Sequence, residues 1–342
     1  LAVGAMVGGM LQLLVQVPAL RREGFRFRPE VAFSDPGVRR VAKLMLPATF
    51  GLAATQINIL VDTILASSYG DGPIAWLQYA FRLILLPIGL FGVALATANL
   101  ARVSRDAARQ DTGAMRDNLA SSLRAAALLT PPASAGLVAL RTPIVRVLFE
   151  HGRFGPEDTE MTAGALLCYA VGLYAYSVTK IQVPTYYALG DTRLPVGASA
   201  AAVALKIAAN FALLALLPRF GVAAFLGLAV STSLAAWTNF LILQRGLRRR
   251  IGTFRGHGVL PTTLQVAALS VLMGFACASL HAFLERTAPG GGIGGEVGRL
   301  ALAIGAGVAI VAAGAFALKI PEARTIASRL ASRAARPGGP RP

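Results

Sequence analysis

The sequence predicts an all-α protein, a polytopic bundle of about nine transmembrane helices. Of its 342 residues, 55% are hydrophobic and only 14% are charged, whereas a soluble domain carries about 25% charged residues. Several windows of about 20 apolar residues follow one another, which is the length that a helix needs to cross the hydrocarbon core. The basic residues gather in the stretches between these windows.

The apolar windows define the expected membrane segments. They are residues 1–20, 44–69, 74–101, 125–149, 161–189, 196–217, 222–244, 259–284 and 297–318. The chain begins inside an apolar run without the basic residues that open a signal peptide. We therefore expect the first segment to be incomplete and an N-terminal part to be missing.

The distribution of basic residues predicts the orientation. Arginines and lysines crowd loops 21–43, 102–124 and 245–257 and the tail 319–342. The alternate loops hold only Arg153, Arg219 and Arg286. Because basic loops stay in the cytoplasm, we expect the three basic loops and the tail to be cytoplasmic.

Several other classes of protein are excluded by the same pattern. The net charge of +17 follows the loops rather than one face, so no nucleic-acid partner is expected. Cys168 and Cys277 lie in apolar segments and are interpreted as packing residues. The three histidines share no ligand spacing, and no catalytic motif is present, so neither a metal site nor an enzyme is expected.

Arg82 is the first candidate functional residue, because it is the single arginine of an otherwise apolar segment. Arg82 falls in segment 74–101, where a charge costs about 2.5–3.5 kcal/mol on insertion scales. Such residues usually face a protein interior or a watery cavity and mark a substrate path. Gln78 lies one turn earlier on the same face, and Asn58 lies on the polar face of segment 44–69. A structural ion pair inside the bundle is the alternative interpretation.

Polar residues of other segments are expected at a similar depth. Asp62, Asn210 and Thr232 each lie about seven to ten residues from the expected outer end of a segment, and Lys206 lies one turn deeper. At 1.5 Å per residue these positions are roughly 10–15 Å inside the membrane. An aspartate there needs a partner, which we expect to be a bound cation, Arg82 or Lys206. Two interpretations of these polar residues remain open: they line a hydrated cavity, or they form a dry buried network.

Four blocks of sequence resemble the MurJ (MviN) family of lipid II flippases. They are Gln56–Ser67, Tyr79–Thr97, the run Leu148-Phe-Glu-His-Gly-Arg-Phe154 with Asp158–Thr159, and Tyr187-Ala-Leu-Gly-Asp-Thr-Arg-Leu-Pro195. The blocks occur in the order and at the spacing of the family. The similarity is continuous from residue 1 to about 250 and weaker beyond.

The resemblance implies the C-terminal part of a fourteen-helix transporter. Residues 1–20 would end the N-terminal lobe, 21–43 would be a cytoplasmic linker, and 44–250 would form the C-terminal six-helix lobe. Residues 259–318 would be two extra helices that form a groove for a lipid tail. Residues 319–342 would be the tail.

The resemblance also implies a function. The substrate would be lipid II, a disaccharide-pentapeptide on an undecaprenyl pyrophosphate. It would move from the cytoplasmic to the outer leaflet of the bacterial inner membrane by alternating access, with Arg82, Gln78 and Asn58 binding it. Arg82 would contact the pyrophosphate, because guanidinium donates a planar fork to phosphate oxygens.

The resemblance implies a coupling site as well. Asp62 matches a family aspartate implicated in cation coupling, with Asn210, Lys206 and Thr232 as its expected neighbours. A lysine here argues against a sodium site and favours protons or the membrane potential as the driving force, with a bound sodium ion as the alternative. No other cofactor is implied. Expected partners are lipid II, membrane lipids and other cell-wall synthesis proteins. The rival functions are export of another polyprenyl-linked oligosaccharide or a drug, and a non-transporting scaffold.

Overall fold

The structure is a computed structural model that describes residues 2–22, 56, 58–254, 256–287, 290, 292–318, 320 and 322. These residues form helices and turns and contain no strand, which confirms the all-α prediction. The chain divides into two compact units, residues 1–59 and 60–342. The first contains α1, Ala2–Arg22.

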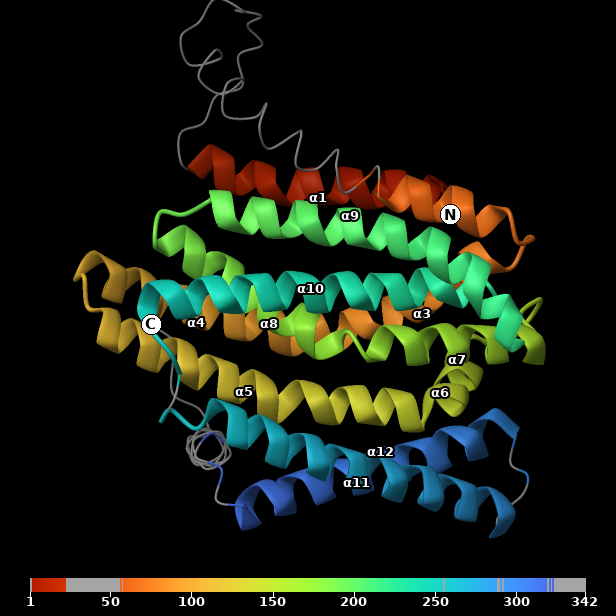
Figure 1. Ribbon diagram of the computed structural model, residues 1–342. Helices are drawn as coiled ribbons and strands as arrows, with labels where there is room; N and C mark the ends of the chain where they lie inside the picture. The colour runs from red at the N-terminus through yellow and green to blue at the C-terminus, as the bar shows by residue number, and fades with distance from the viewer. Residues whose placement is uncertain are drawn as a thin grey trace, which may run out of the picture. The chain divides into compact units, whose positions relative to one another are not determined.

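The second unit is a bundle of long helices joined by short turns (Figure 1). It begins within a short apolar helix, Asn58–Ser67. The labelled helices that follow are α3 Pro73–Pro87, η1 Ile88–Val93, α4 Ala94–Ala108, α5 Thr112–Ala139, α6 Arg141–Phe149, α7 Pro156–Ala170, α8 Leu173–Ala188, α9 Arg193–Leu216, η2 Leu217–Phe220, α10 Leu226–Ile251, α11 Val259–Thr287 and α12 Gly292–Ala317.

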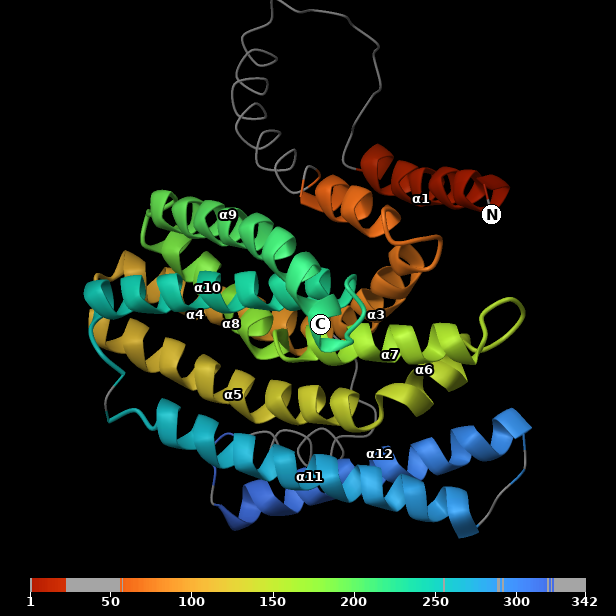
Figure 2. The same ribbon diagram turned by 45° about the vertical axis from the view of Figure 1, so that its right-hand side comes forward.

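Neighbouring helices pack in pairs within this unit. α9 packs on α10, α3 on α7, and α4 on both α5 and α8, while α5 carries the hairpin of α11 and α12. In both views α9 lies at one side of the bundle and the α11–α12 hairpin at the opposite side (Figure 2). The polar residues of α9 are therefore remote from the two C-terminal helices.

The expected number of membrane segments is neither confirmed nor excluded. In the part of the chain that is described, five helices are long and apolar enough to cross a membrane, or seven when each of two bent helix pairs is counted as one span. Half of segment 44–69 lies outside the described residues. The count of nine therefore stays a prediction.

Two expected segments are bent rather than straight. Segment 125–149 divides at Leu140 into α5 and α6, which meet at 75°. Pro143 lies in the first turn of α6, where its missing N–H costs nothing, so the chain restarts a helix there. Segment 161–189 divides at Gly172 into α7 and α8 with a 46° bend. Apolar composition alone predicts the length of such segments and not their direction.

Two expected loops are largely helical. α4 runs to Ala108 and α5 begins at Thr112, so the predicted loop 102–124 contains only a tight turn. Asp111 caps α5 by accepting a hydrogen bond from the Ala114 N–H at 2.9 Å. α10 likewise continues to Ile251 through the arginines of the predicted loop 245–257. Alanine and arginine are good helix formers, so the helices continue beyond the apolar windows.

Pro87 interrupts the helix that carries Arg82. It ends α3 and is followed by the π-helical turn η1. Proline removes one backbone donor and clashes with the preceding turn, and a wider turn accommodates that defect. Gly92 in this turn lies against α8, because a Cβ there would be 3.3 Å from the Cα of Ser177.

Ion pairs fasten the α11–α12 hairpin to α6. Arg146 of α6 lies 3.3 Å from Glu296 of α12 and 3.9 Å from Glu285 of α11. Glu296 also pairs with Arg299 in the next turn. Because Glu296 is buried and has two cationic partners, this contact helps to fix the hairpin on the bundle.

Replacing Gly172 by alanine is expected to destabilise the protein by about 1–3 kcal/mol through overpacking. A Cβ at this position would lie 2.7 Å from Oγ and 3.0 Å from Cα of Ser233 in α10. The measurement is the midpoint of thermal unfolding of the purified protein in detergent. Gly197→Ala is the matched control, since nothing lies within 4 Å of its added Cβ. Equal midpoints for the two variants would contradict the prediction.

Candidate functional site

A partly buried ion pair joins the helix that ends at Ser67 to α9. Nζ of Lys206 lies 2.5 Å from Oδ2 of Asp62, and Nδ2 of Asn210 donates to Oδ1 of Asp62 at 3.1 Å. The Lys206 side chain is 5% exposed and that of Asp62 is 26% exposed, while Asn210 is fully buried. Each carboxylate oxygen of Asp62 thus accepts from a donor on α9.

The sequence of α9 explains why these donors point inward. Its buried residues include Ala198, Ala202, Lys206, Asn210 and Leu214, spaced four apart. This spacing puts them on one face of the helix. Two polar groups therefore lie in the middle of an otherwise apolar buried stripe.

α10 completes the cluster from the other side. The hydroxyl of Ser231 donates to Oδ1 of Asn210, which orients the amide so that its nitrogen faces Asp62. α9 and α10 approach closely because Gly227 faces Leu213; a Cβ on Gly227 would lie 2.9 Å from the Cβ of Leu213. We call Asp62, Lys206, Asn210 and Ser231 the Asp62 cluster.

The structure differs from the sequence prediction at Thr232. Its hydroxyl donates to the carbonyl of Leu228 in its own helix at 2.7 Å, and it is the preceding residue, Ser231, that contacts Asn210. Sequence reasoning missed Ser231 because depth alone does not give the rotation of a helix about its axis. A coupling role for Thr232 stays a prediction.

The Asp62 cluster brings opposite charges together inside the bundle. Removing two ions from water costs several kcal/mol each, and their attraction offsets this cost only when hydrogen bonds satisfy the remaining polar atoms. Both oxygens of Asp62 are satisfied here. A cation bound at this carboxylate would compete with the Lys206 ammonium, which already lies against Oδ2.

Arg82 does not join the cluster. It is exposed on α3, and within the described residues it takes part in none of the ion pairs. Gln78 is exposed one turn before it. Asn58 is half-buried and belongs to the first unit. Of the partners expected for Asp62, the structure thus supplies Lys206 rather than Arg82.

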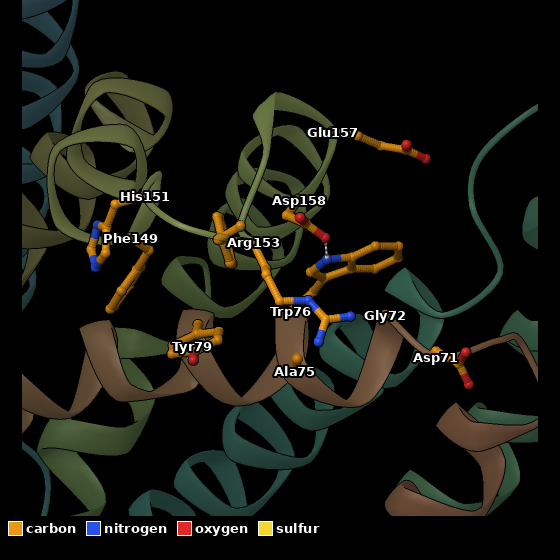
Figure 3. A pocket seen from close by; sticks show the side chains of 11 residues that line it. Asp71, Gly72, Ala75, Trp76, Tyr79, Phe149, His151, Arg153, Glu157 and Asp158 are labelled. Carbon is orange, nitrogen blue, oxygen red and sulfur yellow. Dashed lines mark hydrogen bonds between the residues drawn. The ribbon is translucent and has the colours of Figure 1, made fainter.

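A pocket of about 660 Å³ opens at the start of α3 (Figure 3). Its lining comes from the turn before α3, from α3 itself and from the α6–α7 loop with the start of α7: Asp71, Gly72, Ala75, Trp76, Tyr79, Phe149, His151, Arg153, Phe154, Glu157 and Asp158. We call this the α3–α7 pocket. Six of its lining residues fall within residues 148–159, one of the sequence blocks that resemble the family.

Hydrogen bonds of Asp158 fix one wall of the α3–α7 pocket. One carboxylate oxygen accepts from the indole N–H of Trp76 at 2.7 Å, and the other accepts from the Gly155 N–H at 2.8 Å. The second bond caps the N-terminus of α7. Among the described residues, no group of three His, Cys, Asp or Glu side chains could hold a metal ion.

Known proteins resemble this chain in sequence. The sequence model of the family described as lipid II flippase MurJ matches residues 1–294. The chain is 38% identical over 247 residues to a probable lipid II flippase MurJ of Vibrio cholerae, covering 72% of this chain and 46% of that protein. It is 35% identical over 254 residues to the lipid II flippase MurJ of Burkholderia cenocepacia, covering 73% and 48%. The chain thus spans about half the length of these curated relatives.

Solved structures resemble its fold. A lipid II flippase MurJ in an inward closed conformation matches with a TM-score of 0.64 and 26% identity, covering 84% of this chain and 57% of that one. An outward-facing transporter of the multidrug resistance MATE family matches with a TM-score of 0.51 and 17% identity, covering 81% and 64%, which concerns the fold alone. Together with the long apolar helices, the first match shows an integral membrane protein. The chain belongs to the lipid II flippase MurJ family.

Proposed function

We propose that the protein moves lipid II from the cytoplasmic to the outer leaflet of the bacterial inner membrane by alternating access. Beside family membership, one observation carries the proposal: a guanidinium lies on the uncovered face of an apolar helix. Arg82 and Gln78 share this face of α3 with Ala75. Other described residues cover the opposite face, which carries Leu77, Ala80 and Ile84.

The chemistry of Arg82 suits the charged part of lipid II. A pyrophosphate is anionic, and a guanidinium offers it two parallel donors. In a site with little water this attraction is stronger than at a protein surface. Transport breaks no bond of the substrate, so the proposal needs no catalytic group. Gln78 supplies a further polar contact on the same face, and a substrate-binding role for Asn58 stays a prediction.

The Asp62 cluster is proposed as the coupling element. The Asp62–Lys206 pair can be closed, with the two charges in contact, or open, with the two charges apart. The pair lies within one lobe, so the lobe movement of alternating access would have to change the packing inside that lobe to open the pair and expose both charges to water. The membrane potential or proton movement would then drive the cycle, with Asn210 orienting the carboxylate.

Reconstitution tests the proposed function directly. The full-length protein in vesicles is expected to move labelled lipid II between leaflets, measured as its accessibility to an enzyme added outside. Vesicles with another polyprenyl-linked oligosaccharide or with a drug test the exporter alternative. Movement of those substrates and not of lipid II would reject the proposed substrate. Movement of none would favour the scaffold.

A labelling experiment tests the orientation. In a protein lacking Cys168 and Cys277, single cysteines at Arg28 or Arg249 are expected to resist a membrane-impermeant thiol reagent in intact cells, because basic segments stay in the cytoplasm. A cysteine at Glu160, which is exposed near the start of α7, is expected to react. Permeabilised cells, in which all three sites should react, are the control. The reverse pattern in intact cells would overturn the topology.

A further inference from the structure

The α3–α7 pocket has the size and the lining of a ligand site. Pockets that bind small molecules measure about 300–1,000 Å³ and combine aromatic walls with a few placed polar groups. This pocket measures about 660 Å³ and is lined by four aromatic side chains and by charged residues of both signs. None of the roles assigned above to Arg82 or to the Asp62 cluster uses it.

Three of the aromatic side chains contact one another and form a wall of the pocket. The ring centroid of Tyr79 lies 4.7 Å from that of Phe149 and 5.6 Å from that of Phe154. Trp76 adds a fourth ring, held by Asp158. Flat apolar rings with a polar edge suit a ligand that has both apolar C–H faces and hydrogen-bonding groups, which is the surface of a sugar ring.

A cation faces this wall. Arg153 reaches from the α6–α7 loop toward the part of α3 that carries Ala75 and Trp76 (Figure 3). In the described part of the chain Arg153 forms none of the ion pairs. The carboxylates of Asp71 and Glu157 lie on the same pocket lining and are exposed. The pocket therefore offers a donor for a carboxylate and acceptors for hydroxyl and amide groups.

The pocket continues the face that carries Arg82. Ala75 lines the pocket and is exposed, and it lies seven residues before Arg82, so both point in nearly the same direction. Seven residues of helix span roughly 10 Å. A peptide of five residues can extend roughly 17 Å, so one substrate head group is long enough to reach from Arg82 to the pocket.

We infer that the α3–α7 pocket binds the saccharide and peptide part of the substrate head group, while Arg82 holds the pyrophosphate. The inference rests on the proposed function and assigns a second subsite to it. The ligand class is a carboxylate-bearing sugar–peptide: the aromatic wall packs on a sugar ring, and Arg153 binds a carboxylate.

The probe is the soluble disaccharide-pentapeptide, which lacks both the lipid and the pyrophosphate. Its binding to the full-length protein in nanodiscs is measured at equilibrium. Arg153→Ala is expected to weaken binding at least about tenfold, the loss typical of a hydrogen bond to a charged group. Arg153→Lys should recover part of it. Arg219→Ala removes an arginine of η2 that lies outside the pocket, and this matched control should bind normally.

The outcomes separate this inference from the proposed function. Absence of binding by the unaltered protein, or equal binding by Arg153→Ala, would overturn the pocket assignment whatever Arg82→Ala does to transport. Inorganic pyrophosphate is the second probe: if Arg153→Ala lowers its binding and not that of the sugar–peptide, the pocket is an anion site and the inference falls. Normal lipid II transport by Arg82→Ala would reject only the role of Arg82.

Discussion

Replacing Arg82 by alanine in the full-length protein is expected to abolish growth of a strain depleted of its own lipid II flippase. The guanidinium lies on the uncovered face of α3, and each hydrogen bond to a charged group contributes about 1.5–3 kcal/mol. A pyrophosphate held by two such bonds would lose affinity by a factor on the order of a hundred or more. The measurement is colony formation, together with the amount of protein in the membrane, which should not change.

Two further variants make this result specific. Arg82→Lys should restore growth only in part, because lysine supplies a point charge and no planar fork. Arg219→Ala should grow normally, because this arginine lies in η2, at the end of the apolar span Arg193–Phe220 and on another helix than Arg82. Full growth of the Arg82→Ala strain would reject a role for Arg82 in substrate binding.

The general architecture was predictable because hydrophobic length and loop charge are local properties. The apolar windows give the helical class, and the four-residue spacing of Lys206 and Asn210 predicts that they share a face. The structure confirms that both are buried on one stripe of α9. Identification of Asp62 as a buried acid needing a partner also followed from depth alone, and that partner proves to be Lys206.

Other features depend on tertiary contacts that sequence patterns do not contain. The choice between Lys206 and Arg82 as the partner of Asp62 depends on how α3 and α9 are rotated. The close approach of Gly172 to Ser233 of α10 joins residues about 60 positions apart in the sequence. The α3–α7 pocket is assembled from two segments about 80 residues apart, and only the fold brings Trp76 to Asp158.

Removing the Lys206 ammonium is expected to destabilise the protein strongly. The structure shows two donors at the carboxylate of Asp62, Lys206 and Asn210. In Lys206→Ala, of these two only the amide of Asn210 remains. Leaving a buried charge without its partner costs about 3–5 kcal/mol, and the lower value applies here because Asp62 is 26% exposed. The double variant Asp62→Asn with Lys206→Met removes both charges and should unfold near the temperature of the unaltered protein. Equal unfolding midpoints for Lys206→Ala and the unaltered protein would contradict the prediction.

If the same pair couples transport, as proposed above, it also selects the ion that drives it. An ammonium already lies 2.5 Å from Asp62, and a sodium ion at this carboxylate would be repelled by it. Replacing sodium by choline at fixed membrane potential should therefore leave lipid II movement in vesicles unchanged. The double variant, although stable, should transport little, because it has no charge to respond to potential or protons. A large loss of activity in choline would mean that sodium displaces Lys206 during the cycle, and normal transport by the double variant would show that this ion pair stabilises the fold without coupling transport.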